Sequence, residues 1–300
     1  FFFFFLKKKK KNKTPKGASE LRQAIVATTS PPVRVSAKLV PAEAVEAFVA
    51  GEGQVLFTLL GAPHPHVAAV LDTVAPDALG TGEQGCVVLP AMPGGDLHSL
   101  LRTQRQLPEA TARAYFAQLL AGLQHLHALG LAARDLKLSK LMFADEARTR
   151  LVLADLGGAQ LVGPTGLVAD QRGSPAYVAP EVLAGAPYNA FAADLWAAGV
   201  VLYVMLTGAY PFRDSPRGLL SKIAAGSVHL PPTLSAPARH LLQLLLNRDP
   251  AARLDASPLL HEHPWLTMAP GALAAAQCPP LDLDPGPADD DQVVPGGYYY

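Results

Sequence analysis

The sequence predicts an α+β fold in which a small strand-rich half is followed by a larger helical half. Two observations support this prediction: strand-like patterns come first along the chain, and apolar residues recur at helical spacing through most of the second half. A chain of 300 residues with 50% apolar and 17% charged residues can bury a sizeable core. We expect the strand-rich half at residues 33–94 and the helical half at residues 95–268.

The strand-rich half begins with the alternating, β-branched stretch VRVSAKLV at residues 33–40, as expected of a strand. Residues 42–60 follow Pro41 and predict a helix, which is interrupted by two glycines. Residues 66–74 and 85–91 have the composition of two further strands. Together these elements predict a small sheet accompanied by one helix.

The helical half begins after Pro108, where apolar residues recur at helical spacing until Gly130 ends the pattern. Short apolar stretches at residues 141–143 and 151–154 predict a small hairpin. Further helices are expected at residues 192–207, 217–225, 235–247 and 256–261.

One uncharged stretch, residues 195–212, approaches the ~18 residues that a membrane helix needs. Gly208 and Pro211 end its helical part early, and Asp194 stands at its start, where a carboxylate can cap a helix. We therefore expect a fully buried core helix and no membrane partner.

The bulk composition limits the classes of partner. The formal net charge is +0, so the chain lacks the broad basic field that attracts nucleic acid, and we expect no nucleic-acid partner. Two cysteines cannot form a disulfide framework, and so low a count suits a reducing compartment.

Both ends of the chain differ in composition from its centre. Residues 1–32 begin with FFFFFLKKKKK, an apolar block before a basic run, which is the reverse of a secretory signal. We expect a disordered or non-native segment there, with the basic run as a candidate nuclear signal. Residues 269–300 are rich in Pro, Ala, Gly and Asp and predict a flexible tail.

A set of polar landmarks occurs along residues 33–267 in an order that resembles a protein kinase. The landmarks are Lys38 in VSAKLV, Arg134, Asp135 and Lys137 in one short loop, Asp155 in Asp-Leu-Gly, Glu181 in Ala-Pro-Glu, Asp194, and Arg253. The resemblance implies a bilobal protein-kinase-like fold, with a small strand-rich N-lobe and a larger helical C-lobe.

The same resemblance implies a role for each landmark. Lys38 and Asp155 would bind the nucleotide, with Asp155 as a weak metal ligand. Asp135 would accept the substrate proton and Lys137 would neutralise the transferred phosphate, both as vestiges of a catalytic loop. The remaining landmarks would be structural: Arg134, Glu181, Asp194 and Arg253.

Several positions depart from a working kinase. No G-x-G-x-x-G precedes Lys38, so we expect a truncated N-lobe. Ala133 replaces a His, and Lys140 stands where an Asn would bind the second magnesium. At ~4 Å and an effective dielectric near 20, one pair of like unit charges costs about 4 kcal/mol, which disfavours two-metal catalysis. Asp155 argues the other way, because one metal ligand survives.

Two contacts of the landmark residues stay open. The usual position for a glutamate partner of Lys38 falls near Val55, and Glu52, one turn earlier, either substitutes for it or is a solvated charge. We favour the solvated charge. A phosphate on Thr165 or Ser174 would pair with the catalytic-loop arginine, and an unmodified loop is the alternative.

Within the kinases, the chain is most similar to the Tribbles pseudokinases. The stretch RDLKLSKLMFADEARTRLVL resembles the Tribbles catalytic loop, which also has a basic residue in place of Asn, and GSPAYVAPEVL and LLSKIAAGSVHLPPTLS match that family. Tribbles proteins generally replace Asp-Phe-Gly with Ser-Leu-Glu, whereas this chain keeps Asp155. A related family, the Tribbles-like serine/threonine kinase homologues, shares DQRGSPAY at residues 170–177 and is the nearest alternative.

The tail strengthens the Tribbles resemblance. Tribbles tails carry Asp-Gln-Ile/Val-Val-Pro and then an acid, a motif that docks to the constitutive photomorphogenic ubiquitin ligase. This chain has Asp291, Gln292, Val293, Val294 and Pro295, followed by Gly296 in place of the acid. The motif implies that the tail recruits the ligase.

The resemblance implies an adaptor rather than an enzyme. The kinase-like domain would hold a transcription-factor degron in its substrate groove, in the nucleus and cytoplasm, while modulating mitogen-activated protein kinase signalling. No cofactor is required, and weak ATP binding with or without Mg²⁺ stays open. The alternatives are a weakly active serine/threonine kinase that transfers the ATP γ-phosphate, and a kinase-fold structural protein that binds neither ligase nor nucleotide.

The stretch LLHEHPW at residues 259–265 has a second implication. The corresponding Tribbles stretch, Leu-Leu-His-Pro-Trp, is implicated in binding mitogen-activated protein kinase kinases, and this chain carries an insertion in it. A metal site at His261 and His263 is not expected, because i, i+2 residues do not share a helix face.

Overall fold

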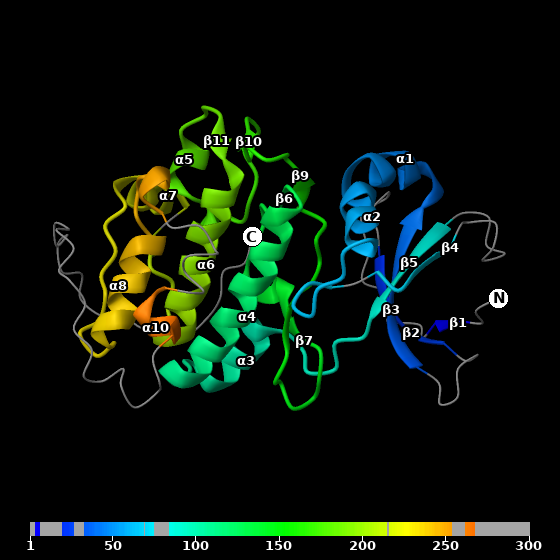
Figure 1. Ribbon diagram of the computed structural model, residues 1–300, viewed down its shortest axis with the longest axis horizontal. Coiled ribbons are helices and arrows are strands. Elements are labelled where there is room, and N and C mark those ends of the chain that lie inside the picture. Colours follow the sequence, from blue (N-terminus) through cyan, green and yellow to red (C-terminus); the bar gives the residue numbers. More distant parts are fainter. Residues whose placement is uncertain are drawn as a thin grey trace.

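The computed structural model describes residues 4–6, 20–26, 33–68, 70–74, 84–214, 216–253 and 262–267. It has two parts: a strand-rich N-lobe with two short helices, and a larger C-lobe built mainly from helices (Figure 1). This bilobal α+β arrangement confirms the predicted fold class.

The N-lobe contains a five-stranded sheet with the order β1-β2-β3-β5-β4. The strands are β1 (Phe4–Leu6), β2 (Glu20–Val26), β3 (Val33–Pro41), β4 (Asp72–Val74) and β5 (Gln84–Pro90). Neighbouring strands are antiparallel, and Lys38 on β3 lies opposite Val87 on β5. Small and branched apolar side chains of β3 and β5 form a core cluster on this sheet: Val35, Ala37, Leu39, Cys86 and Val88.

Two expectations for the N-lobe need correction. Residues 1–32 were expected to be disordered or non-native, but the segment contains two strands: β2 pairs along its whole length with β3, and β1 pairs with β2. The strand expected at residues 66–74 is only β4 in the described residues. Upstream of β4, Val67 instead forms an isolated parallel bridge with Leu153 of the C-lobe.

The helix expected at residues 42–60 is present but irregular. It consists of η1 (Ala42–Ala44), α1 (Val45–Phe48), the π-type turn η2 (Val49–Gly53) and α2 (Gln54–Leu60). Both glycines of the segment lie in η2, where a wider turn replaces the α-helical one. The π-type turn changes the helical phase between Glu52 and the buried side chain of Val55.

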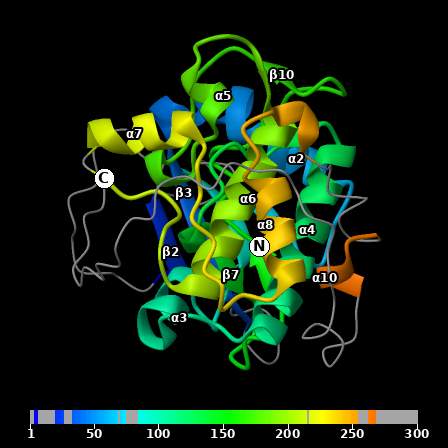
Figure 2. The same cartoon turned by 90° about the vertical axis from the view of Figure 1, so that its left-hand side faces the viewer.

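The C-lobe helices are α3 (Leu97–Gln104), α4 (Glu109–Ala128), α5 (Pro180–Leu183), α6 (Ala190–Thr207), α7 (Pro216–Ala225), α8 (Ala236–Leu245) and α10 (Pro264–Thr267). Short 3-10 helices are η4 (Leu138–Lys140), η5 (Pro175–Tyr177) and η6 (Pro250–Ala252). α6 lies between α4 and α8 in Figure 1 and contacts both, and in Figure 2 α8 covers it on the side that faces the viewer. The helix expected at residues 256–261 lies outside the described residues.

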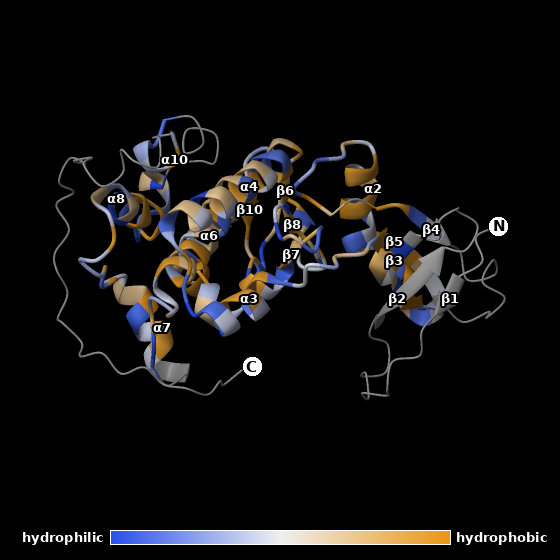
Figure 3. Cartoon of the chain, turned by 90° about the horizontal axis from the view of Figure 1, so that it is seen from below, coloured by the Kyte–Doolittle hydropathy of each residue, from blue (hydrophilic) through white to orange (hydrophobic). Residues whose placement is uncertain are grey.

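α6 is the described helix that is long and apolar enough to cross a membrane. Apolar positions run along its whole length (Figure 3), and 78% of its most apolar window is buried inside the protein. The expectation of a core helix is therefore confirmed. Asp194, however, does not cap α6, because Asn189 accepts from the backbone amides of Phe191 and Ala192 instead.

Three two-stranded ladders complete the C-lobe. β7 (Leu141–Phe143) and β8 (Leu151–Leu153) form the predicted hairpin. β6 (Leu131–Ala132) pairs with β9 (Gln160–Leu161), and β10 (Leu167–Val168) pairs with β11 (Tyr188–Asn189). These two ladders and α3 were not predicted. The β6–β9 ladder places the segment between residues 155 and 181, here called the activation segment, against the strand that precedes Asp135. The β10–β11 ladder pairs the middle of this segment with the residues that precede α6.

Candidate functional site

The Lys38 side chain is paired with Glu52 across the N-lobe. Its Nζ atom lies 2.5 Å from Oε2 and 2.6 Å from Oε1 of Glu52, and both side chains are mostly buried. The expectation of a solvated Glu52 is therefore wrong. Counting residues pointed to Val55, but the π-type turn shifts the helical phase, so Glu52 faces β3 while Val55 enters the core.

Lys140 lies between the two carboxylates that a kinase uses for chemistry. Its Nζ atom is 2.7 Å from Oδ2 of Asp135 and 3.9 Å from Oδ2 of Asp155, and its side chain is only 11% exposed. Lys137 adds a second ammonium 3.3 Å from Asp135 Oδ2. Asp135 is therefore paired with two cations rather than free to accept a proton.

The surroundings of Asp135 set its protonation state. Burial alone would raise the pKa of its carboxyl group, but hydrogen bonds from Lys140 and Ser174 outweigh burial and hold the pKa below its usual range. Asp135 therefore stays ionised at neutral pH, and the ion pair with Lys140 persists.

Asp155 is the most accessible of the expected cofactor residues. Its side chain is 61% exposed, and its backbone has a φ of 52° in the left-handed region. A Cβ atom built on Gly157 would lie 3.3 Å from Asp155 Oδ1 and 3.4 Å from Glu52 Oε2, so the Lys38–Glu52 pair and Asp155 converge at this glycine. The chain thus brings Lys38 and Asp155 to one place, as expected of a nucleotide site.

The same place fits a metal ion poorly. Within the part of the chain that the structure describes, no group of three or more His, Cys, Asp or Glu side chains is arranged to hold a metal. The carboxylates of Asp135 and Asp155 both face the ammonium of Lys140, which stands between them. A divalent cation bound between these carboxylates would be repelled by the Lys140 ammonium, so the residues present do not fit the metal that two-metal transfer needs.

Asp194 holds the loop that carries Asp135. Its carboxylate accepts hydrogen bonds from the backbone N–H groups of Ala133 and Arg134, both at 2.7 Å, and contacts Nε2 of His127 at 3.0 Å. Asp194 is buried, so these contacts satisfy a charge that burial would otherwise penalise. The implied structural role of Asp194 matches this geometry, even though Ala133 has replaced the loop histidine.

A second buried ion pair anchors the end of the activation segment. Arg253 donates to both carboxylate oxygens of Glu181, at 2.5 and 2.8 Å, and to the carbonyl oxygen of Ala192 at 2.8 Å. Its guanidinium also lies over the Trp196 ring, 5.2 Å from the centroid. The two residues therefore meet as the kinase resemblance implies.

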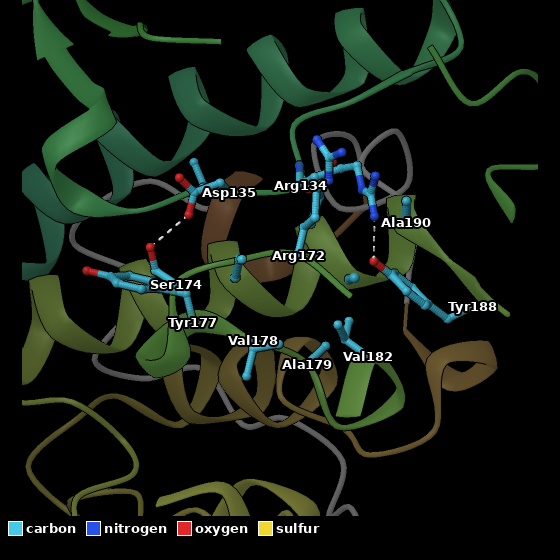
Figure 4. Close-up of a pocket in the computed structure, with 15 residues that line it drawn as sticks. Arg134, Asp135, Arg172, Ser174, Tyr177, Val178, Ala179, Val182, Tyr188 and Ala190 are labelled. Atoms are coloured by element: carbon cyan, nitrogen blue, oxygen red, sulfur yellow. Dashed lines mark hydrogen bonds between the residues drawn. The ribbon is translucent and has the colours of Figure 1, made fainter. Parts of the chain in front are cut away.

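The activation segment closes over the catalytic loop and forms the wall of a small hollow (Figure 4). Ser174 Oγ donates to Asp135 Oδ1 at 2.8 Å and accepts from Lys137 Nζ at 3.0 Å. Apolar side chains line the hollow beside this contact, among them Leu136, Tyr177, Val178 and Val182. The hollow therefore lies directly beside Asp135, between the catalytic loop and the activation segment.

Sequence reasoning missed the residue that meets Arg134. The guanidinium binds Asp170, together with Gln160 and Tyr188. Asp170 lies 36 residues from Arg134 along the chain, so only the tertiary structure reveals the pairing.

The remaining candidates fall outside this site. The tail motif at residues 291–295 lies outside the described residues. His263 was not expected to bind a metal. It is buried, and its Nε2 atom lies 2.9 Å from Nδ1 of His240. His261 is not among the described residues.

Comparison with known proteins completes these observations. The Protein kinase domain family matches residues 36–266. The chain is 44% identical to Tribbles homolog 3 of Bos taurus over 239 residues, which is 78% of this chain and 62% of that protein. It is 44% identical to Tribbles homolog 3 of Homo sapiens over 71% of this chain and 58% of that protein, and 44% identical to Tribbles homolog 2 of Mus musculus over 58% and 51%. The chain thus spans about half to two thirds of the length of these relatives.

Proposed function

The chain belongs to the protein kinase domain family, and on this premise we propose that it is a Tribbles-like pseudokinase that acts as an adaptor rather than as a phosphotransferase. One observation carries the proposal: the ammonium of Lys140 lies 2.7 Å from Asp135 and 3.9 Å from Asp155. It neutralises the residue that would accept the substrate proton and repels the cation that would bind the phosphates.

The supports of a peptide groove are retained while the chemistry is lost. Asp194 still holds the catalytic loop, the Glu181–Arg253 pair still anchors the activation segment, and Ser174 still bonds to Asp135. An arrangement that positions a peptide but cannot transfer phosphate suits capture of a partner. We infer that the groove holds a degron of a transcription factor and that no cofactor is required for this.

The tail would supply the second contact. Residues 291–295 carry the Asp-Gln-Val-Val-Pro sequence of the ligase-docking motif, and the composition of residues 269–300 predicts a flexible connection. Linking two weak docking sites through a flexible tail raises the effective concentration of ligase at the captured degron without new contacts. Mitogen-activated protein kinase kinases are a further proposed partner, with nucleus and cytoplasm as the sites of action.

Titration of a peptide spanning residues 284–300 against the substrate-reading domain of the ligase tests the adaptor function. We expect saturable binding that Val294→Ala abolishes and that Pro287→Ala, a change outside the motif in the same peptide, leaves intact. Absence of binding, or equal binding by the Val294→Ala peptide, would refute ligase recruitment.

A weakly active kinase is the second candidate, and two observations favour it. The Lys38–Glu52 pair is formed, and Asp155 keeps an exposed carboxylate beside it. Thermal unfolding with ATP, in the presence of Mg²⁺ or of EDTA, separates the two candidates. A large Mg²⁺-dependent rise in the unfolding temperature that Asp155→Ala abolishes would favour the kinase. A small rise that is equal in EDTA would favour the adaptor with weak, metal-independent ATP binding.

A further inference from the structure

The buried Arg134 guanidinium is neutralised from within the activation segment. One terminal nitrogen donates to Asp170 Oδ1 at 2.7 Å and to the Asp170 carbonyl at 2.8 Å, and the other donates to Oδ2 at 3.2 Å. Tyr188 and Gln160 accept the remaining bonds from these nitrogens. The Arg134 side chain is only 1% exposed, so it needs a nearby anion to offset its desolvation.

The partner of this arginine decides how an activation segment is ordered. In switched kinases, a phosphate added to the segment pairs with arginine and orders the loop. Here the Asp170 carboxylate already makes the paired, charge-assisted hydrogen bonds that a phosphate would make. Arg172 adds a second cation, with its Nε 2.7 Å from Asp170 Oδ2.

Ser174 and Thr165, the two candidate phosphorylation sites, make contacts with other residues than Arg134. Ser174 Oγ is bonded to Asp135 and Lys137, so a phosphate there would face the Asp135 carboxylate. The Thr165 carbonyl accepts from the Asn189 side chain at the β10–β11 end of the segment. The hydrogen bonds of the Arg134 guanidinium go to Asp170, Gln160 and Tyr188 instead.

The residues between Asp170 and Ser174 connect the Arg134–Asp170 ion pair to the hollow beside Asp135. Gly173 has a φ of 131°, and a Cβ atom built on it would lie 3.4 Å from the carbonyl oxygen of Arg134, so the segment runs close along the catalytic loop. Ser174 then reaches Asp135, and Tyr177 follows with its hydroxyl 3.4 Å from the backbone nitrogen of Leu138. The hydrogen bond from Arg134 also holds the pKa of the Asp170 carboxyl below its usual range, so the anion persists at neutral pH.

We propose that Asp170 is a built-in counter-ion that holds the activation segment in its groove-forming arrangement without phosphorylation. Peptide capture is then constitutive, and the supply of partner and ligase controls the output. The inference rests on the proposed function for its biological meaning, but the ordering of the segment is a property of the chain alone.

Hydrogen exchange on the full, unphosphorylated chain tests the proposal, with mass spectrometry confirming the absence of phosphate. Asp170→Asn keeps the shape and removes the charge, and Asp170→Glu keeps the charge. Glu146→Gln makes the same carboxylate-to-amide change at an exposed residue between β7 and β8, outside the activation segment. We expect slow exchange over residues 170–178 in the wild type, exchange at least about tenfold faster in Asp170→Asn, and an intermediate effect in Asp170→Glu. Glu146→Gln should exchange like the wild type.

Wild-type exchange in the Asp170→Asn variant, with its thermal unfolding temperature unchanged, would overturn the proposal. If that variant fails to fold, a second measurement tests the proposal. Hydrogen exchange is then compared in wild-type protein from eukaryotic cells before and after phosphatase treatment. Identical exchange over residues 170–178 supports a built-in counter-ion, and faster exchange after phosphatase treatment overturns it. Because neither measurement uses a degron or the ligase, its result is independent of the peptide titration that tests the adaptor function.

Discussion

Replacing Lys140 by Asn should restore a dependence of nucleotide binding on Mg²⁺. The change removes the ammonium between Asp135 and Asp155 and introduces the neutral side-chain oxygen that a kinase places there. The magnitude follows from the geometry. Lys140 Nζ is 3.9 Å from Asp155 Oδ2, and a magnesium ion sits about 2.1 Å from a ligand oxygen, so the two cations would be at most about 6 Å apart.

At that separation, the repulsion between a unit and a divalent charge is about 5.5 kcal/mol for an effective dielectric of about 20, and about 1.4 kcal/mol for water. The Asp155 side chain is 61% exposed, which favours the lower part of this range. Since about 1.4 kcal/mol corresponds to one factor of ten, Lys140→Asn should raise the affinity for a Mg²⁺–nucleotide complex at least about tenfold.

Isothermal titration with ADP, in Mg²⁺ and in EDTA, measures the effect directly. Lys137→Asn is the matched control, because it removes the same charge from the same loop 3.3 Å from Asp135 but adds no ligand at position 140. Lys140→Met removes the positive charge without adding a ligand oxygen. It should therefore raise the affinity for the Mg²⁺–nucleotide complex less than Lys140→Asn does. Equal Mg²⁺ dependence in Lys140→Asn and the wild type, with unchanged thermal unfolding, would refute the assignment of Lys140 as the group that excludes the metal.

Three further predictions concern stability. Glu181→Gln leaves the fully buried Arg253 without its counter-charge and should lower the free energy of unfolding by about 3 kcal/mol in urea titrations; a loss under about 1 kcal/mol would contradict an anchoring role. Burial, with His240 as a second cause, lowers the pKa of His263 to about 4, so the unfolded chain binds a proton first on acidification. Stability should therefore fall by about 2 kcal/mol between pH 7.5 and pH 5, and the fall should shrink by that amount in His263→Phe. Asn189→Ala removes the cap of α6 and should cost about 1 kcal/mol, while Asn189→Asp should retain most of the stability.

Elements with strong periodicity were predictable from the sequence. The apolar spacing in α4 marks a helix because its period repeats over many residues, and the apolar run of α6 marks a buried helix because it is too long for a strand. The small hairpin of β7 and β8 was predictable for a similar reason, since two short apolar stretches lie close together along the chain. β6, β9, β10 and β11 have only two residues each, and so short a segment carries no measurable period.

The irregular elements were not predictable in the same way. Glu52 is the clear case: residue counting assumes a constant helical phase, and the π-type turn η2 breaks that assumption three residues before Val55. The Lys38–Glu52 pair therefore emerges only when the helix is placed against β3.

The sequence by itself determined which charges the site contains. Lys140 in place of Asn and Ala133 in place of His can be read directly from the sequence, because the residue type fixes the charge of a side chain. The tertiary structure alone decided which partners those charges meet. Lys140 was expected to repel a metal, and the structure shows it paired with Asp135 and close to Asp155. For Arg134 the sequence offered only a phosphate on Thr165 or Ser174, and the structure brings it Asp170. Coulomb interactions depend on distance in space, and only folding converts separation along the chain into that distance.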